Sequence, residues 1–246
     1  TDGEWERFFQ QNIANANEGI KEKTRRIQDG DTAQAFKRDT GESKNIRLLD
    51  KKCIHNNTLQ VINQYTVSQA EGAAHDNRYD VTILVNGLPL VHVELKRRGV
   101  AIREAFNQIN RYKRDSFWAG SGLFDYVQIF VISNGTNTKY YSNTTRLGHI
   151  KDFNSSAARK RGKTSNSFEF TSFWADAKNR IIPDLMDFTK TFFAKATILN
   201  ILTKYCVFTS EELLLVMRPY QIVATERILN RIEIATNYKR YGTVQG

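Results

Sequence analysis

The chain has 246 residues, and its 40% hydrophobic and 11% aromatic content is ordinary for a globular domain with a core. No apolar stretch reaches about 18 residues, so we expect no membrane-spanning helix. The 36 lysines and arginines exceed the 26 aspartates and glutamates, giving a formal charge of +10. Such an excess favours a polyanionic partner such as nucleic acid, although many basic proteins bind none.

Apolar periodicity predicts two N-terminal helices, in residues 4–16 and 19–28, and leaves the polar residues 37–57 unassigned. Runs rich in β-branched and aromatic residues then predict strands at 59–67, 79–85 and 89–96. Asn86-Gly87 between the last two is a strong hairpin signal. A helix is predicted at 102–114, followed by strands at 126–133 and 138–142. The first of these two strands is very apolar, which indicates a central place in the sheet.

Residues 143–167 show no apolar periodicity, and we predict a long flexible loop there. Its basic run, Arg159-Lys160-Arg161-Gly162-Lys163, either is solvated or touches a phosphate backbone. Helices are predicted at 181–193, 194–205 and 219–234. The order of elements favours an α/β fold with a central mixed sheet flanked by helices and a helical C-terminal extension. We expect a core domain at 1–150, the loop at 151–167 and the extension at 168–246.

Three charged residues stand at the ends of two apolar strands. Asp80 closes Asn77-Arg78-Tyr79-Asp80, and after thirteen positions Glu94-Leu95-Lys96 follows. Charged groups avoid such positions unless a partner or a metal compensates them. The trio is therefore a candidate site, the alternative being an ion-pair ladder on the surface of a hairpin.

The turn decides whether the two carboxylates meet. A plain two-residue turn at Asn86-Gly87 pairs Val85 with Leu88 and points Asp80 away from Glu94. A three-residue loop, with Leu84 opposite Leu88, places both acids on one face. We predict this loop or an equivalent β-bulge.

Two carboxylates on one face repel each other unless a hard cation lies between them, and oxygen ligands suit Mg²⁺. Such an ion lowers the pKa of a bound water, and the adjacent Lys96 ammonium can position that water. These parts together indicate phosphodiester hydrolysis. On the following helix, Gln108 and Tyr112 are four residues apart and share a face, which could approach the metal or a phosphate.

Asp80, Glu94-Leu95-Lys96 and Gln108-Ile109-Asn110-Arg111-Tyr112 resemble the PD-(D/E)xK nuclease signature with the Gln-x-x-x-Tyr extension of RecB-like branches. The amino-acid sequence of residues 85–96 resembles the R subunit of type I restriction-modification enzymes in particular. The pattern departs from the family at Tyr79, which stands where the family name has Pro, and at His92, which replaces a usually aliphatic residue. His92 could lie beside the metal or be structural or solvent-facing.

The resemblance implies a restriction-endonuclease-like core and a role for each matching residue. Asp80 and Glu94 would bind Mg²⁺, with the Leu95 carbonyl as a further ligand. Lys96 would assist the attacking water, and Gln108 and Tyr112 would support the site or contact DNA. An upstream helical glutamate sometimes joins such sites, and Glu4 and Glu6 are the candidates here.

Arg218-Pro219-Tyr220-Gln221 resembles the opening segment of a superfamily 2 helicase motor, in which the glutamine reads the adenine of ATP. The resemblance implies ATP contacts for Gln221 and Arg218 in a longer subunit, although Pro also opens ordinary helices. The chain contains no Gly-x-x-x-x-Gly-Lys-Ser/Thr phosphate loop, so we expect a fragment without ATPase activity of its own.

The resemblance further implies double-stranded DNA and separate methylase and specificity subunits as partners. Cys53 and Cys206 form neither a disulfide framework nor a zinc spacing, which indicates a reducing, cytoplasmic compartment. Two other functions stay open: a RecB-like repair nuclease or junction resolvase relative, and a catalytically silent domain that docks DNA or partner subunits.

Overall fold

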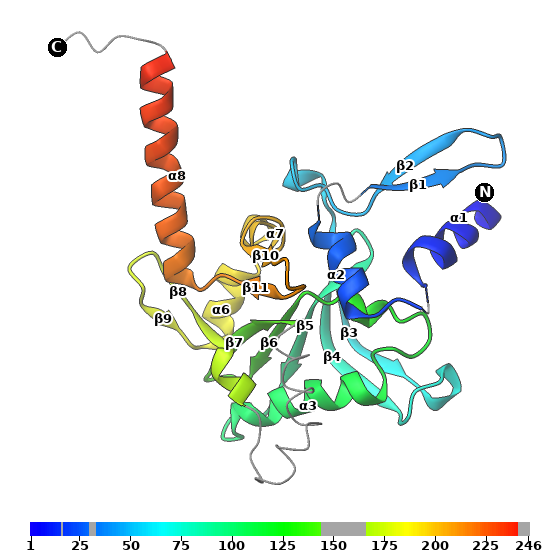
Figure 1. Cartoon of the computed structure of the whole chain (residues 1–246). Coiled ribbons are helices and arrows are strands. Elements are labelled where there is room, and N and C mark those ends of the chain that lie inside the picture. Colours follow the sequence, from blue (N-terminus) through cyan, green and yellow to red (C-terminus); the bar gives the residue numbers. More distant parts are fainter. Residues whose placement is uncertain (16, 30–32, 144–165, 241–246) are drawn as a thin grey trace.

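A mixed seven-stranded sheet lies at the centre of the computed structural model, which describes residues 1–15, 17–29, 33–143 and 166–240 (Figure 1). The strands follow each other in chain order across the sheet, and only β5 and β6 run parallel to each other. The α/β prediction is therefore confirmed. The apolar β6 lies fourth of seven, which confirms its predicted central place. The strands are β3 Leu59–Val67, β4 Asn77–Val85, β5 Leu88–Leu95, β6 Ile129–Ser133, β7 Thr138–Ser142, β8 Ser172–Ala175 and β9 Ile181–Ile182.

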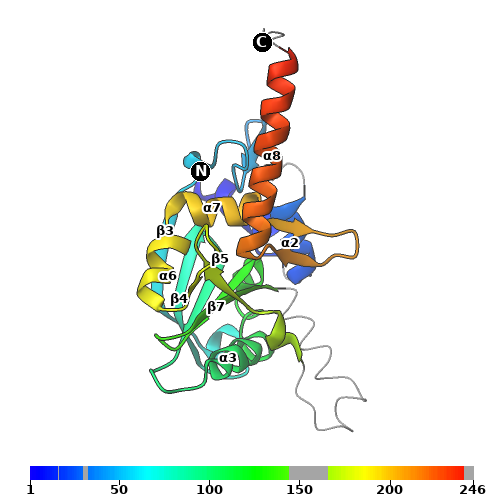
Figure 2. The ribbon, with the colours of Figure 1, turned by 90° about the vertical axis from the view of Figure 1, so that its left-hand side faces the viewer.

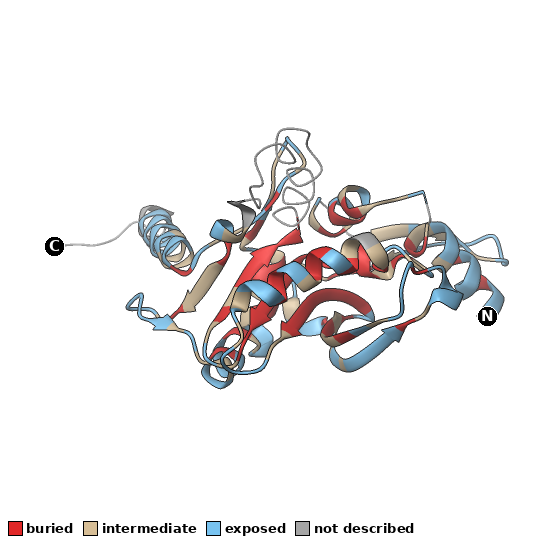
Figure 3. Cartoon of the chain, turned by 90° about the horizontal axis from the view of Figure 1, so that it is seen from below, coloured by how far each residue is buried: buried red, intermediate tan, exposed pale blue. Residues whose placement is uncertain are grey.

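Helices cover both faces of this sheet, and each face has its own hydrophobic core. Helix α3 (Ile102–Asp115) packs on one face through Phe106, Ile109 and Tyr112, and its buried side is turned to the strands in Figure 3. Other helices cover the opposite face, and Figures 1 and 2 show them away from α3. They are α1 Asp2–Phe8 with its π-helical continuation Phe9–Ile13, α2 Ile20–Gln28, α6 Leu185–Phe192 and α7 Lys195–Thr203.

The predicted helix 181–193 is wrong at its start. Ile181–Ile182 forms strand β9, paired with β8, and α6 begins only at Leu185. The residue before a proline avoids the helical region, and here Pro183 follows Ile182. Asp184 then caps α6 by accepting hydrogen bonds from the backbone N–H groups of Met186 and Asp187.

Two short antiparallel strand pairs lie outside the central sheet, and the sequence did not predict either. β1 (Ala33–Lys37) with β2 (Ser43–Arg47) accounts for part of the unassigned polar segment. β10 (Cys206–Phe208) with β11 (Leu214–Val216) follows α7, which ends before the predicted residue 205. Short 3₁₀ helices complete the chain, at Ile54–Asn56, Gln69–Glu71, Leu123–Tyr126 and Asn166–Phe170.

The C-terminal helix α8 (Pro219–Arg240) runs beyond the predicted residue 234 and projects from the rest of the molecule (Figures 1 and 2). The predicted loop lies mainly in residues 144–165, outside the described residues, as does its basic run from Arg159 to Lys163. The division of the chain at residue 150 stays a prediction, and the sheet itself continues beyond it into β8 and β9. No helix in the described ranges is long and apolar enough to cross a membrane.

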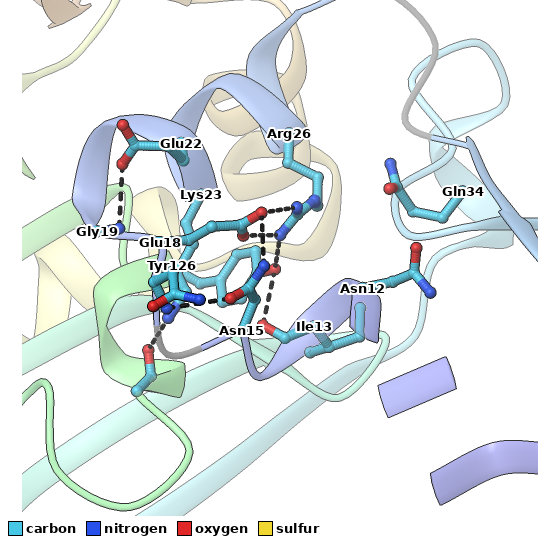
Figure 4. A network of polar contacts seen from close by, with 12 residues as sticks. Asn12, Ile13, Asn15, Glu18, Gly19, Glu22, Lys23, Arg26, Gln34 and Tyr126 are labelled. Carbon is cyan, nitrogen blue, oxygen red and sulfur yellow. Dashed lines mark hydrogen bonds and ion pairs between the residues drawn. The ribbon is translucent and has the colours of Figure 1, made fainter. Parts of the chain in front are cut away.

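A buried polar network joins α2 to the segment after α3 (Figure 4). The Lys23 side chain is almost fully buried, and its Nζ donates to the Gly122 carbonyl at 2.8 Å. Arg26 bonds both Glu18 and the Tyr126 hydroxyl, which in turn donates to the Ile13 carbonyl at 3.1 Å. Because every charge in this network has a partner, the network holds the N-terminal helices against the sheet without an unpaired buried ion.

The β4–β5 hairpin differs from the expected three-residue loop. Val85 pairs with Leu88, so the turn has two residues, and Asn86 (φ 51°) and Gly87 (φ 86°) both adopt the left-handed region of a type I′ turn. The register then shifts by one residue, because Leu84 pairs with Pro89 while Ile83 pairs with Val91. The three-residue loop is therefore wrong, and the equivalent bulge, with Leu90 as its extra residue, is confirmed.

Asn86 also fastens this turn to the segment that precedes β3. Its Oδ1 accepts from the Thr58 N–H at 2.8 Å, and its Nδ2 donates to the Leu48 carbonyl at 3.1 Å and to Asn57 Oδ1 at 2.9 Å. These bonds hold the turn of the hairpin in place, and the bulged pairing of β4 with β5 begins at this turn.

We predict that Asn86→Ala lowers the free energy of unfolding by about 2–3 kcal/mol, because it removes three side-chain hydrogen bonds at a left-handed position. Asn179→Ala is the matched control: Asn179 also has a positive φ (61°), but its side chain makes no hydrogen bond with the described residues. Its loss should be about 1 kcal/mol. Denaturant titration of both variants checks this, and equal losses would contradict the role given to the Asn86 side chain.

Candidate active site

The bulged register brings the two predicted acids together. Val81 pairs with Val93 and Thr82 with His92, and the same register continued by one residue sets Asp80 opposite Glu94. Asp80 Oδ2 accepts a hydrogen bond from the Leu95 backbone N–H at 2.8 Å. Burial raises the pKa of Asp80, the Leu95 bond opposes this, and the negative charge of Glu94 raises it further. The two carboxylates therefore share one electrostatic environment.

Only 1% of the surface of Glu94 is exposed to solvent, which is unusual for a residue with a carboxylate. Its Oε1 accepts from Lys96 Nζ at 2.8 Å, and the Lys96 side chain keeps contact with solvent. Its Oε2 has no hydrogen-bond partner within the described part of the chain. A buried carboxylate with an unused oxygen is costly unless something completes its shell. Lys96 therefore compensates only part of the charge.

Gln108 and Tyr112 meet on α3 as predicted. The Tyr112 hydroxyl accepts from Gln108 Nε2 at 2.8 Å and donates to the Arg78 carbonyl at 3.0 Å, which joins α3 to β4 just before Asp80. Burial raises the pKa of Tyr112, and the charges of Glu94 and Asp80 raise it further. The hydroxyl therefore lies within the field of both carboxylates.

His92 is completely buried, so the solvent-facing alternative is wrong. Its Nε2 lies 3.7 Å from Glu94 Oε2, and its Nδ1 lies 3.4 Å from the hydroxyl of Thr82. Thr82 is a functional candidate that the sequence analysis did not single out. Its pairing with His92 across the bulged hairpin is the signal that could have identified it.

The other candidates from the sequence analysis form hydrogen bonds away from Asp80 and Glu94. Glu4 accepts from the Asp39 backbone N–H at 2.9 Å, and exposed Glu6 pairs with Gln10, so neither glutamate contacts the site. At the start of α8, Gln221 Oε1 accepts from the Arg218 N–H at 2.8 Å, which is a helix-capping bond. Figure 1 shows α8 and α3 at opposite ends of the molecule.

The arrangement suits a hard divalent cation. Within the described ranges, no group of three or more His, Cys, Asp or Glu side chains is placed to hold a metal. Asp80 and Glu94 alone are enough for Mg²⁺, which binds through one or two carboxylates and keeps several waters. The unpartnered Glu94 Oε2 and the mutual repulsion of the acids both fit an added positive charge.

Comparison with known proteins shows the family of the chain. A family model described as "Type I restriction enzyme R protein N terminus" matches residues 2–149, more than half of the chain. The chain belongs to this family. The match includes Asp80, Glu94, Lys96, Gln108 and Tyr112.

Similar members of this R-protein family are named as endonuclease subunits. The chain is 53% identical over 232 residues to the type I restriction enzyme EcoprrI endonuclease subunit of Escherichia coli, covering 94% of this chain and 67% of that protein. It is 36% identical over 220 residues to the SsaAORF53P endonuclease subunit of Staphylococcus saprophyticus, covering 89% of this chain and 21% of that protein. The chain thus spans about two thirds of one relative and about a fifth of the other.

We predict that Tyr112→Phe lowers the free energy of unfolding by about 1–2 kcal/mol, because the Arg78 carbonyl and Gln108 lose their partner. The folded state favours the protonated hydroxyl, so this contribution is complete below about pH 10 and is lost as pH rises through the raised pKa of the folded protein. The difference from the unmodified chain should therefore shrink above about pH 10.

Tyr65→Phe is the control, because the half-exposed Tyr65 hydroxyl makes no hydrogen bond with the described residues. Its effect should be near zero at every pH. Urea titrations across this range measure both variants, and a pH-independent difference for Tyr112→Phe would contradict the placement of the hydroxyl.

Proposed function

We propose that this chain is the Mg²⁺-dependent endonuclease domain of a type I restriction enzyme R subunit and hydrolyses phosphodiester bonds of double-stranded DNA. The observation that carries the proposal is the bulged register that aligns Asp80 with Glu94 while Lys96 bonds Glu94. The family match to residues 2–149 supports it. A buried Glu94 opposite a half-buried Asp80, with one amine beside them, is difficult to explain by packing alone.

In this proposal Asp80 and Glu94 hold the cation, and the Leu95 carbonyl is a third oxygen ligand. The Leu95 N–H holds the Asp80 carboxylate in place. The backbone of β5 therefore orients Asp80, and the same strand supplies the second ligand, Glu94. Lys96 is partly exposed, so its ammonium can leave Glu94 Oε1 to position a water and to neutralise charge that develops on the phosphate. Bound Mg²⁺ would lower the pKa of that water and polarise the phosphate.

Gln108 and Tyr112 have a supporting role in this proposal. Tyr112 is almost fully buried and keeps its proton because its pKa is raised, so it is a hydrogen-bond donor rather than a base. Gln108 is half-buried and is the member of the pair that can reach a DNA phosphate. The Arg78 carbonyl bond anchors both residues against β4.

We further propose that cleavage follows ATP-driven translocation by motor domains of a longer, cytoplasmic R subunit. Partner methylase and specificity subunits would select the DNA. Gln221 and Arg218 would contact the adenine of ATP in that subunit, and their capping bond at the start of α8 holds the glutamine at a defined position. The coverage of the relatives, about a fifth in one case, supports a larger protein.

The alternative functions are less well supported. A RecB-like repair nuclease would use the same acids and lysine, but the family match favours the restriction subunit. A silent docking domain would have no need to keep Glu94 buried with a free oxygen beside Lys96.

We predict that Asp80→Asn or Lys96→Ala, introduced into the whole R subunit assembled with its partners, lowers DNA cleavage at least about 100-fold. ATPase activity and DNA binding should persist, because neither residue contributes to the core. Linearisation of a circular substrate measures DNA cleavage, and phosphate release measures ATPase activity.

The exposed Asp187–Lys190 pair on α6 is a matched acid–lysine control. Asp187→Asn and Lys190→Ala remove the same charges away from the site, and their cleavage rates should equal that of the unmodified complex. Unchanged cleavage in Asp80→Asn and Lys96→Ala would reject the proposed function.

A further inference from the structure

His92 and Glu94 each turn one buried polar atom toward the other on the face of the sheet that α3 covers. His92 Nε2 and Glu94 Oε2 are both buried and lie 3.7 Å apart, and neither has a hydrogen-bond partner among the residues that the structure describes. Leaving one buried polar atom unpaired is costly, so a juxtaposed pair needs an explanation. The gap exceeds a hydrogen bond by only a few tenths of an ångström, which a small rotation of the Glu94 side chain would close.

The contact made by Nδ1, the other ring nitrogen, determines which nitrogen of His92 carries the proton. Nδ1 lies 3.4 Å from the buried hydroxyl of Thr82, which sits directly across the hairpin. A hydroxyl can donate or accept, but only donation to Nδ1 leaves the proton on Nε2, facing the carboxylate. The other tautomer would turn a nitrogen lone pair toward a carboxylate oxygen. The surroundings of both ring nitrogens therefore favour an Nε2–H group that faces Glu94.

Aromatic side chains hold the ring of His92 in this orientation. Their ring centroids lie within 6.5 Å of the imidazole, and all of the contacts are edge-to-face, which fixes the plane of the ring. The rings belong to Tyr79, Tyr112, Phe117, Phe124 and Phe130. Such a site would accept phenylalanine, so histidine supplies something other than shape.

We propose that His92 is a positioning residue for Glu94: its Nε2–H donates to Oε2, and Thr82 orients the imidazole. This inference rests on the proposed function, in which Glu94 binds the cation. Each carboxylate oxygen has two lone pairs, so the bond from His92 leaves acceptor capacity on both oxygens for the metal. Hydrogen bonds to metal-binding carboxylates hold them in the ligating orientation.

The test is the affinity of the 246-residue chain for Mn²⁺, followed by electron paramagnetic resonance, in three variants. His92→Phe keeps the ring and removes the donor. His92→Asn places an amide near the Nδ1 position, and His92→Gln places one near the Nε2 position. We expect about tenfold weaker Mn²⁺ binding for His92→Phe and His92→Asn, as for other partners of metal ligands. His92→Gln should restore near-original affinity, with all variants folded by near-ultraviolet circular dichroism.

Glu94→Gln separates failure of this inference from failure of the proposed function. Absence of Mn²⁺ binding in the unmodified chain, or binding unaffected by Glu94→Gln, would overturn both. Binding lost in Glu94→Gln but unchanged in His92→Phe would overturn the role of His92 alone. Equal losses in all three His92 variants, in step with their melting temperatures, would also overturn it, because the ring's packing rather than its donor would then be responsible.

Discussion

The extra residue in β5 is the constraint on which the candidate site depends. Side chains alternate along a strand, so a register shift of one residue moves every side chain to the other face. The tight Asn86-Gly87 turn by itself would direct Asp80 and Glu94 to opposite faces. The bulge at Leu90 reverses this, and Val81 paired with Val93 carries the corrected register to the acids. The apolar partners Ile83 and Val91 still face the core on the other side, so one irregularity serves both the core and the site.

Burial then gives the site its chemistry. Glu94 lies beneath α3, beside rings that exclude water, and Asp80 lies half-buried at the strand end. Electrostatic interactions strengthen in such surroundings, so each acid responds to the other, to Lys96 and to any bound cation. Tyr112 joins the helix to β4 through the Arg78 carbonyl and thereby keeps α3 over the acids. The same residues thus close the core and define the polar environment of the site.

The sequence predicted those parts of the fold whose signals are local. The strand Leu59–Val67 and helix α3 have clear periodicity, and both appear at or within one residue of their predicted bounds. The requirement that Asp80 and Glu94 share a face predicted a three-residue loop or an equivalent bulge. The hydrophobic pattern, which both alternatives keep, could not choose between them. β9 to β11 were missed, since strands of two or three residues carry too little pattern to compete with neighbouring helical segments. The sequence left the place of His92 open between the metal, the interior and the solvent, because the aromatic residues that bury it come from separate segments of the chain.

A crystal structure of the chain grown with Mn²⁺, with anomalous scattering recorded at the manganese edge, tests the central claim most directly. We predict one anomalous peak about 2.0–2.3 Å from carboxylate oxygens of both Asp80 and Glu94, a distance typical of hard-cation ligation. The bulge at Leu90 should be retained. An absence of any peak at these residues, or side chains of Asp80 and Glu94 on opposite faces of the sheet, would contradict the account.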